Sequence, residues 1–265
     1  MNKQIVVFSD LDATLLDHQS YRFEAANQAL DKLKKFNIPL VLNSSKTKPE
    51  MQKIRHQLDN QHPYIVENGA ALVIPADYFQ NEMEEIVNFS SEYSSILAEL
   101  EVLKAEGFQF RHFNTLTVRE VSELTNLSET DAEMAKSRFG TEPLLWDDSE
   151  DKLAEFTMRL NEQQLKLIKG GRFYHVIGLF DKGKAVEYAL SLYKDKYELK
   201  KILSIGLGDS PNDIPMLEAV DIAVVIKSGR TPEMQLNNRN TIFSRLEGPA
   251  GWNQEILALL NQKGQ

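Results

Sequence analysis

Two aspartates separated by one residue, Asp10 and Asp12, follow directly after the apolar run at residues 5–8. The run has the composition of a buried parallel strand. In open α/β sheets, ligands bind outside the carboxyl ends of the strands, so both carboxylates are expected to face the active crevice. Two like charges held this close repel each other, and a cation between them relieves that repulsion. Taken alone, the pair is also compatible with an Asx-type turn.

A second acidic site follows another apolar run near the C-terminus. The run at residues 202–205 leads into the segment 206–216, which contains Asp209 and Asp213. The glycines of this segment allow a sharp turn, and Pro211 suits the first turn of a helix. The pattern predicts a second pair of carboxylates at the end of a strand.

Two further polar segments lie between the acidic sites. Residues 43–47 supply hydroxyl groups and a lysine after a strand expected at 39–42, and residues 181–184 supply an aspartate and two lysines. Carboxylates are hard oxygen ligands for Mg²⁺, while hydroxyl groups and lysine bind phosphate oxygens. The inventory therefore indicates a Mg²⁺ site combined with a phosphoryl-binding site.

Composition limits the alternatives. The chain has 265 residues, of which 42% are hydrophobic, enough for one large or two modest domains with substantial cores. Its net charge of −9 disfavours nucleic acid and anionic membranes as general partners. The sequence contains no cysteine, which excludes disulfides and zinc–thiolate sites. No apolar segment has the length of a membrane span, and we expect a cytoplasmic protein.

The hydrophobic pattern changes along the chain. Up to about residue 81, apolar helix stripes alternate with short strands, which predicts right-handed crossovers and a parallel sheet. From residue 82 a long amphipathic helix and alternating strands replace this pattern, and the first pattern resumes near residue 180. We therefore predict an α/β protein with a Rossmann-like parallel sheet core at residues 1–81 and 180–265. An α+β cap is inserted at residues 82–179.

Local signals in the predicted cap indicate where its elements begin and end. Thr130 and Glu133 resemble a capping box that opens a helix toward Ser137. Gly170 and Gly171 are expected to end a helix before a strand at residues 173–177.

In this order, the polar segments resemble the motifs of the haloacid dehalogenase superfamily of phosphotransferases. The matching positions are residues 10–14, Ser44, Lys182 and residues 208–213. A cap between the second and third motifs resembles the Cof-type branch. Further runs are similar to those of the mannosyl-3-phosphoglycerate phosphatases, among them Glu67-Asn68-Gly69-Ala70, Gly171-Arg172-Phe173-Tyr174-His175 and Gly248-Pro249-Ala250-Gly251-Trp252. One departure is Ala13, where the family more often has glycine. The effect is expected to be small unless the backbone there needs a positive φ.

The resemblance implies a phosphatase that works through an aspartyl-phosphate. Asp10 is then the nucleophile, and Asp12 protonates the leaving group and later deprotonates water. Mg²⁺ would be held by Asp10, the backbone carbonyl of Asp12, and Asp209. Asp213 would orient a metal-bound water or the motif lysine.

The resemblance also assigns the groups that bind phosphoryl oxygens. Ser44 would bind these oxygens, and Lys182 would add positive charge to nucleophile and phosphate. Ser45 is the neighbouring alternative, but Ser44 is preferred because Lys46 then occupies the place of the family's frequent arginine. Asn212 is a further candidate for a substrate contact.

The expected partner is a small phosphorylated sugar or glycoside. A phosphorylated glycoside of glycerate carries a carboxylate, which Arg138 or Arg172 would suit, with a surface ion pair as the alternative for each arginine. Glu67 and Asn68, at the end of a core strand, could bind sugar hydroxyl groups. His175 is expected to pack in a strand because Asp12 already fills the acid–base role.

Other functions remain open at this point. Another phosphatase of this architecture could act on sucrose phosphate, hexose phosphates or nucleotides. A signalling receiver also uses clustered acids and a phospho-aspartate, but it is about half as long and has no use for Asp12. A phosphomutase would return the phosphoryl group to a sugar. The choice between mannosyl and glucosyl substrates and the oligomeric state are not determined by the sequence.

Overall fold

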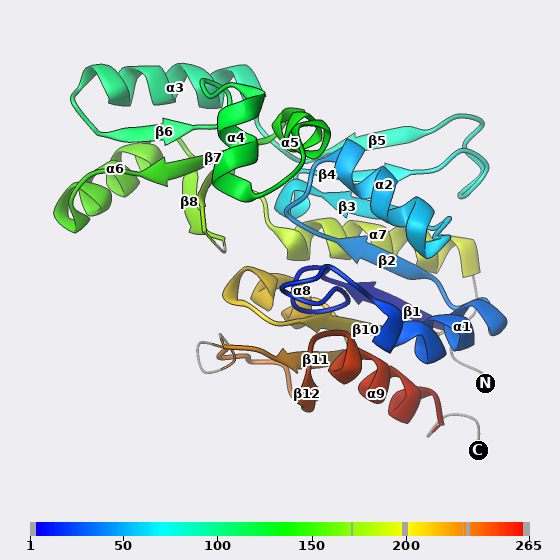
Figure 1. Cartoon of the computed structure of the whole chain (residues 1–265). Coiled ribbons are helices and arrows are strands. Elements are labelled where there is room, and N and C mark those ends of the chain that lie inside the picture. The colour runs from blue at the N-terminus through cyan, green and yellow to red at the C-terminus, as the bar shows by residue number, and fades with distance from the viewer. Residues whose placement is uncertain (1–3, 171, 198–200, 230, 232–233, 262–265) are drawn as a thin grey trace.

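The computed structural model describes residues 4–170, 172–197, 201–229, 231 and 234–261. Two sheets organise these residues (Figure 1). The larger sheet has eight strands in the order β12-β11-β10-β1-β2-β3-β4-β5, and the smaller has four in the order β6-β7-β9-β8. The α/β fold class predicted from the sequence is confirmed.

The strands of the larger sheet are β1 (Gln4–Ser9), β2 (Leu40–Asn43), β3 (Tyr64–Val66), β4 (Ala71–Ile74), β5 (Glu85–Asn88), β10 (Ile202–Gly208), β11 (Ile222–Lys227) and β12 (Thr241–Glu247). The helices beside it are α1 (Asn27–Lys35), α2 (Lys48–Leu58), α7 (Lys182–Tyr197), α8 (Ile214–Glu218) and α9 (Gly248–Asn261). The smaller sheet consists of β6 (Phe110–His112), β7 (Thr141–Trp146), β8 (Lys166–Lys169) and β9 (Tyr174–Ile177). The helices between β5 and β9 are α3 (Tyr93–Ala105), α4 (Val118–Thr125), α5 (Glu129–Lys136) and α6 (Glu150–Glu162). Short 3₁₀ turns are η1 (Glu24–Ala26), η2 (Glu67–Gly69) and η3 (Pro211–Asp213).

The strand directions bring the predicted motifs to one edge of the larger sheet. From β12 through β3 all neighbouring strands are parallel, whereas β4 and β5 are antiparallel additions. The strand β1 lies between β10 and β2, with Ser9 opposite both Leu207 and Leu42. The polar segments that follow these strands therefore begin side by side, as expected for the carboxyl edge of a parallel sheet.

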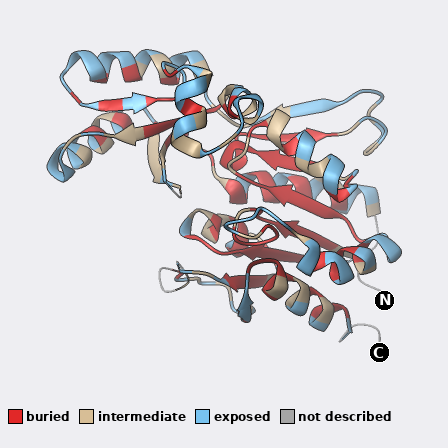
Figure 2. Ribbon diagram, viewed as in Figure 1, coloured by how far each residue is buried: buried red, intermediate tan, exposed pale blue. Residues whose placement is uncertain are grey.

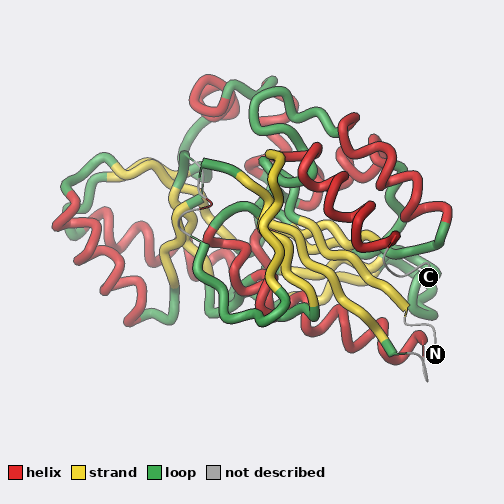
Figure 3. Tube along the Cα trace, turned by 90° about the horizontal axis from the view of Figure 1, so that it is seen from below, coloured by secondary structure: helices red, strands yellow, loops and turns green. Residues whose placement is uncertain are grey.

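Helices cover both faces of the larger sheet, which explains why its strands are apolar throughout (Figure 2). Alternate residues of β1 point to opposite faces. Val7 packs with α1, α2 and α9, and Phe8 packs with α7 and α8. Seen from below, the larger sheet forms one twisted layer with helices on both sides, and the smaller sheet lies beyond one end of it (Figure 3). No helix among the described residues is long and apolar enough to cross a lipid bilayer.

Two local predictions were wrong. The helix α5 begins at Glu129, and Ser128 caps it by accepting a hydrogen bond from the Asp131 N–H, so Thr130 lies inside the helix. Gly170 follows the strand β8 and not a helix, because the helix before it already ends at Glu162. Gly171 lies outside the described residues.

The strand β5 lies within the range 82–179 that the sequence analysis assigns to the cap, although it pairs with β4 of the larger sheet. We therefore propose that the cap begins after β5.

Candidate active site

Three aspartates meet at the carboxyl edge of the larger sheet. Asp10 follows β1, Asp209 follows β10, and Asp213 ends the turn η3. One carboxylate oxygen from each lies within 4.8 Å of the others, and all three residues are buried. Oxygen ligands of this kind fit a hard divalent cation, so the donor chemistry suits the predicted metal.

Lys182 joins two of these aspartates. Its Nζ lies 2.6 Å from Oδ1 of Asp10 and 2.6 Å from Oδ1 of Asp213. Burial lowers the pKa of Lys182, but the two carboxylates outweigh burial and the net pKa is raised. Burial and then Asp213 raise the pKa of Asp10 well above its ordinary value, against the opposing effect of Lys182. Further positive charge at this site would favour the ionised form of Asp10.

The sequence around Asp213 fixes its carboxylate. Oδ2 of Asp213 accepts hydrogen bonds from the backbone N–H groups of Asp209 and Ser210, both at 3.1 Å. At Gly208 a Cβ atom would lie 2.5 Å from Cβ of Asp213, so only glycine fits there. Thr14 donates from its hydroxyl group to Oδ1 of Asp209 at 3.3 Å. The turn at residues 208–213 therefore holds the carboxylates of Asp209 and Asp213 in fixed positions.

Asp12 occupies a different environment from Asp10. Its Oδ2 lies 2.9 Å from Nζ of Lys46, and its side chain is 35% exposed. Its Oδ1 has no hydrogen-bond partner among the described residues. The structure therefore separates the two aspartates of the opening motif: Asp10 belongs to the buried cluster, and the side chain of Asp12 faces the cavity beside it.

The backbone at Ala13 has a positive φ, which is the case in which alanine was expected to matter. Its φ is +63°, in the left-handed region that favours glycine. The turn is closed by a hydrogen bond of 2.8 Å from the Leu16 N–H to the Leu11 carbonyl. Alanine therefore occupies a position where its methyl group costs energy.

Ser44 and Ser45 differ in their surroundings. Ser44 is fully buried, and its backbone donates to the Ile65 carbonyl and accepts from the Asn68 N–H. Ser45 and Lys46 line the cavity beside the aspartates. The two serines are adjacent in sequence, but only Ser45 contributes to the cavity wall.

The turn η2 connects several motif segments. Glu67, Asn68 and Gly69 all have positive φ, at 49°, 58° and 98°. A Cβ atom on Gly69 would lie 2.2 Å from the Asp181 carbonyl oxygen, so the close approach requires glycine. Asn68 accepts from the side-chain amide of Asn212 at 3.3 Å and lines the cavity. Strained backbone of this kind is held in place by its surroundings and concentrates at functional sites.

Glu67 has a different place from the one expected. Its fully buried carboxylate accepts hydrogen bonds from the N–H groups of Phe139, Gly140 and Thr141 and from the Thr141 hydroxyl group, at 2.8–3.2 Å. It is not part of the cavity wall. The structure therefore does not bring Glu67 to the position of a sugar contact, and it connects the larger sheet to β7 instead.

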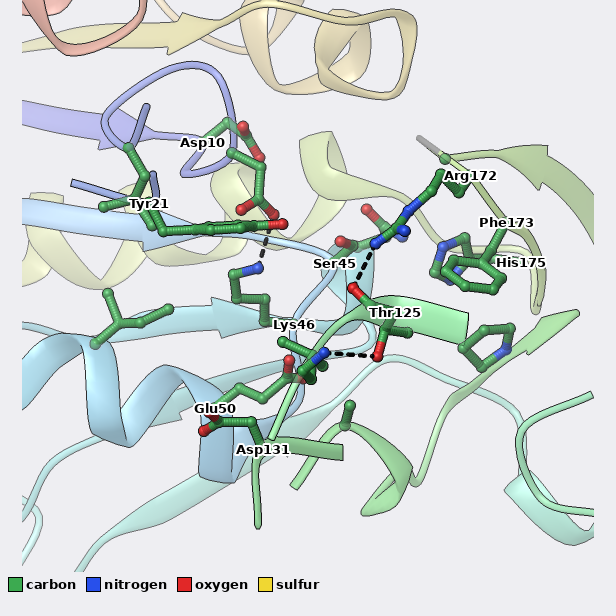
Figure 4. A pocket seen from close by; sticks show the side chains of 18 of the residues that line it. Asp10, Tyr21, Ser45, Lys46, Glu50, Thr125, Asp131, Arg172, Phe173 and His175 are labelled. Atoms are coloured by element: carbon green, nitrogen blue, oxygen red, sulfur yellow. Dashed lines mark hydrogen bonds and ion pairs between the residues drawn. The ribbon is translucent and has the colours of Figure 1, made fainter. Parts of the chain in front are cut away.

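A cavity of about 530 Å³ extends from the aspartates between the larger sheet and the segments around α4, α5 and β9 (Figure 4). This volume lies within the range typical of sites for small molecules. Eight of the predicted catalytic, metal-binding or substrate-binding residues line it: Asp10, Asp12, Ser45, Lys46, Asn68, Arg138, Arg172 and Asn212. Phe173, from the run at residues 171–175, also lines it, as do Tyr21 and Phe113, which no sequence pattern predicted.

The two arginines are held by backbone and hydroxyl oxygens. Arg138 donates to the Ala135 carbonyl at 3.0 Å and to the Thr141 hydroxyl group at 2.8 Å. Arg172 donates to the carbonyl of Thr125 at 2.7 Å (Figure 4). Neither arginine forms a salt bridge within the described part of the chain. Both guanidinium groups line the cavity, and the charge of Arg138 also acts on buried Glu67, where it opposes the rise in pKa that burial causes.

His175 lies in β9 and lines the same cavity. Burial, with a smaller contribution from Arg138, lowers the pKa of His175 to about 3. Its Nδ1 has no hydrogen-bond partner among the described residues. The residue is therefore a neutral member of the wall at ordinary pH.

Comparison with known proteins identifies the family. The model of the haloacid dehalogenase-like hydrolases matches residues 7–241. The chain belongs to this family. A glucosyl-3-phosphoglycerate/mannosyl-3-phosphoglycerate phosphatase from Persephonella marina is 38% identical, covering 97% of this chain and 98% of the relative. A protein of the same name from Methanococcoides burtonii is 35% identical, covering 97% of each chain.

Solved structures share the fold. A phosphatase of the haloalkanoate enzyme superfamily from Bacteroides thetaiotaomicron has a TM-score of 0.66 at 19% identity, covering 99% of this chain and 96% of that chain. The sucrose-phosphatase from Synechocystis, solved with sucrose and phosphate, has a TM-score of 0.63 at 15% identity, covering 99% of both chains. At these identities the likeness concerns the fold alone.

The family and the two relatives make the protein a phosphoric monoester hydrolase, as the motifs predicted. Phosphatases of this family generally use a divalent metal, and the buried aspartate cluster has ligands suited to one.

Proposed function

We propose that the protein hydrolyses the phosphate ester of mannosyl-3-phosphoglycerate or glucosyl-3-phosphoglycerate, with Mg²⁺ as its cofactor and through an aspartyl-phosphate. The observation that carries the substrate class is the pair of relatives named for these substrates, each of which covers 97% of this chain. The charges in the cavity agree with such a substrate. Lys46 lies near the aspartates and Arg138 and Arg172 lie elsewhere in the wall, which suits a ligand with two anionic groups.

Asp10 is the proposed nucleophile. One of its carboxylate oxygens forms a bond to phosphorus while the bond from phosphorus to the ester oxygen breaks, and Asp12 gives its proton to the departing alkoxide. Asp12 then takes a proton from water, whose oxygen attacks phosphorus and releases phosphate from Asp10. Asp10 is held 2.6 Å from Lys182, whereas Asp12 faces the cavity, where a leaving group or a water molecule could reach its carboxylate.

Asp10, Asp209 and the backbone carbonyl of Asp12 would hold Mg²⁺, and Asp213 would orient Lys182 or a metal-bound water. When bound, Mg²⁺ supplies positive charge that lowers the repulsion between a carboxylate nucleophile and a phosphate anion. Lys182 supplies charge of the same sign at 2.6 Å from Asp10.

The remaining residues would bind substrate. Ser44 is proposed for the phosphoryl oxygens on the basis of the motif, and Ser45 is its neighbour in the cavity wall. Lys46, Asn68 and Asn212 are proposed to contact the phosphate end of the substrate. Arg138 or Arg172 would bind the glycerate carboxylate, because a guanidinium group matches a carboxylate in a bidentate contact.

We also propose that the segment between β5 and residue 179 acts as the cap that selects the substrate. This segment contributes both arginines, Phe113 and His175 to the cavity wall. A cap that closes over the site would exclude bulk water from the phosphoryl group during the reaction.

The test is a phosphate-release assay with mannosyl- and glucosyl-3-phosphoglycerate beside sucrose phosphate, hexose phosphates and nucleotides. We expect the highest kcat/KM with a glycosyl-3-phosphoglycerate and no turnover after chelation of divalent ions, with recovery on addition of Mg²⁺. Equal turnover of simple sugar phosphates would show that the proposed substrate is wrong. An isomerised sugar phosphate as product would identify a phosphomutase.

The intermediate can be tested separately. Asp12→Asn should slow hydrolysis of the aspartyl-phosphate by about 10²–10⁴-fold because the base that activates water is lost. The mass of the intact, acid-quenched variant should then increase by one phosphoryl group. The same experiment with Asp10→Asn should give no increase.

A further inference from the structure

One wall of the cavity has no part in the proposed chemistry. It consists of His18, Ser20 and Tyr21 from the loop after β1, together with Lys53, Ile54 and Gln57 of α2. We call these six residues the core wall. We propose that the core wall is the subsite for the hexose ring of the substrate and that Tyr21 is its aromatic platform. This inference rests on the proposed function and adds to it a specificity site outside the cap.

The loop after β1 presents Tyr21 in a fixed conformation. Asp17 accepts hydrogen bonds from the backbone N–H and the hydroxyl group of Ser20, at 2.8 and 2.7 Å. The Tyr21 N–H donates to the Asp17 carbonyl at 3.0 Å, and the Asp17 N–H donates to the Arg22 carbonyl at 2.8 Å. These bonds close the loop on itself, so little ordering of the loop is left for binding.

The backbone of Tyr21 is strained. Its φ is +56°, a left-handed conformation that is unusual for a bulky side chain. Tyr21 is also 51% exposed, so no burial of the ring accounts for the conformation. A large aromatic ring held on the surface in a strained turn suits contact with a ligand, because its apolar face and its hydroxyl group can both be used.

Tyr21 is close to the reacting groups. Nζ of Lys46 lies 5.4 Å from the centroid of the Tyr21 ring, and the same Nζ lies 2.9 Å from Oδ2 of Asp12. Figure 4 shows Tyr21 extending from its loop toward Lys46. Only Lys46 therefore separates a ligand group packed on the ring from the carboxylate of Asp12, the proposed acid–base group. A position beside Lys46 suits a sugar that is attached near the phosphate ester.

The face of α2 that lines the cavity completes the core wall. Its residues Lys53, Ile54 and Gln57 have the spacing of one helix face, and Glu50, one turn earlier and outside the core wall, also lines the cavity. Lys53 is paired with Asp131 of α5, with Nζ 2.5 Å from Oδ1, so its charge is balanced. Gln57 offers both donors and an acceptor, and Ile54 offers apolar surface.

The two sides of the cavity therefore differ in charge. The cap side carries Arg138 and Arg172 without salt bridges within the described residues, whereas Lys53 on the core wall is paired with Asp131. A carboxylate is better accommodated between the arginines. An uncharged polyol is better accommodated by a tyrosine ring and an amide.

The test compares Tyr21→Ala with Tyr21→Phe on two substrates, glycosyl-3-phosphoglycerate and 3-phosphoglycerate, which lacks the hexose. Tyr21→Ala should lower kcat/KM for the glycosyl substrate by about tenfold and change that for 3-phosphoglycerate by less than about twofold. Tyr21→Phe keeps the ring and should retain most of the activity. Phe36→Ala, which removes another exposed aromatic residue outside the cavity, is the matched control.

A second measurement does not depend on turnover of 3-phosphoglycerate. The dephosphorylated glycosylglycerate should inhibit the wild-type protein, and its inhibition constant should rise by about tenfold in Tyr21→Ala and also rise in Gln57→Ala. Inorganic phosphate should inhibit all three proteins equally. Tyr21→Gly removes both ring and backbone strain, and we expect it to match Tyr21→Ala if the ring binds the sugar.

The outcomes separate the two proposals. A wild-type protein with no preference for the glycosyl substrate would contradict the proposed function. A wild-type preference that Tyr21→Ala leaves unchanged would overturn the hexose subsite alone. Equal losses on both substrates would also overturn it, because Tyr21 would then act through Lys46.

Discussion

The aspartate cluster and the cavity wall differ in the charge state of their buried ionisable groups. Lys182 is buried among carboxylates, and because Asp10 and Asp213 outweigh the cost of burial its pKa is raised and it stays charged. His175 is buried in the wall without a carboxylate partner, and its pKa is lowered, so it stays neutral. A buried charge is thus kept at the proposed site of bond breaking, whereas the buried His175 of the wall is neutral.

The two regions also differ in how they are built. The cluster comes from short segments that directly follow parallel strands, and a shift of one residue would remove a carboxylate from it. The wall comes from loops, helix faces and a strand of the smaller sheet, and its two arginines donate to backbone carbonyl groups. We expect substitutions in the cluster to affect the chemical step and substitutions in the wall to affect binding.

The largest effect is expected at the proposed nucleophile. Asp10→Asn should lower kcat by about 10⁴-fold or more, because the amide cannot form the covalent intermediate. The protein should remain folded, which circular dichroism would check. Asp59→Asn, at an exposed helix end, is the control and should have nearly normal activity. Near-normal phosphate release by Asp10→Asn would remove the basis of the mechanism.

The sequence predicted the cluster because its signals are local. Each of Asp10, Asp209 and Lys182 lies near a strand end or a glycine turn that can be read within a few residues. Their convergence then follows from the direction of the strands. The same logic identified the order of the main elements and the parallel centre of the sheet.

The wall was predicted less well because its partners are distant in sequence. Glu67, expected at the cavity, instead accepts hydrogen bonds from residues 139–141 at the start of β7, and no residue near Glu67 in the sequence predicts these bonds. Tyr21 lies in a loop, where periodicity gives no information. The start of α5 was misplaced because Ser128 and Thr130 are both good caps, and only the observed hydrogen bond of Ser128 distinguishes them.

Arg138→Lys tests whether the cavity wall acts in binding and not in the chemical step. Arg138→Lys keeps the charge but loses the planar fork that donates to Ala135 and Thr141. We expect KM for a glycosyl-3-phosphoglycerate to rise by about tenfold and kcat to change by less than about threefold. Arg119→Lys, in an exposed pair on α4, is the matched control. A fall in kcat with unchanged KM would assign Arg138 to the chemical step instead.

The neutral state of His175 predicts a pH dependence of stability. The pKa of His175 is about 3 in the folded protein, below its ordinary value of 6.5. Between these values the unfolded chain binds a proton that the folded protein does not bind, so stability is lost as the pH falls below 6.5. At pH 5 this loss amounts to about 2 kcal/mol by linkage.

Urea unfolding at pH 7.5 and pH 5 would measure it. In His175→Gln the difference in unfolding free energy between the two pH values should be smaller than in the wild-type protein by up to about 2 kcal/mol. His62, whose pKa is lowered to about 4, contributes equally to both proteins and cancels. Equal pH dependence in the two proteins would mean that His175 is protonated in the folded state.

The smallest effect is expected at Ala13, within the opening motif but outside the chemistry. Its φ of +63° costs about 1 kcal/mol for a residue with a Cβ atom, and Ala13→Gly removes that cost. The greater freedom of glycine in the unfolded chain offsets part of the gain. We therefore expect a rise in unfolding free energy of about 0.5 kcal/mol at unchanged kcat, measured by urea unfolding beside phosphate release. Ala154→Gly, on the helix α6, should instead lower stability by about 1 kcal/mol, because the helix interior disfavours glycine. A loss of stability in both variants would mean that the turn around Ala13 carries no strain.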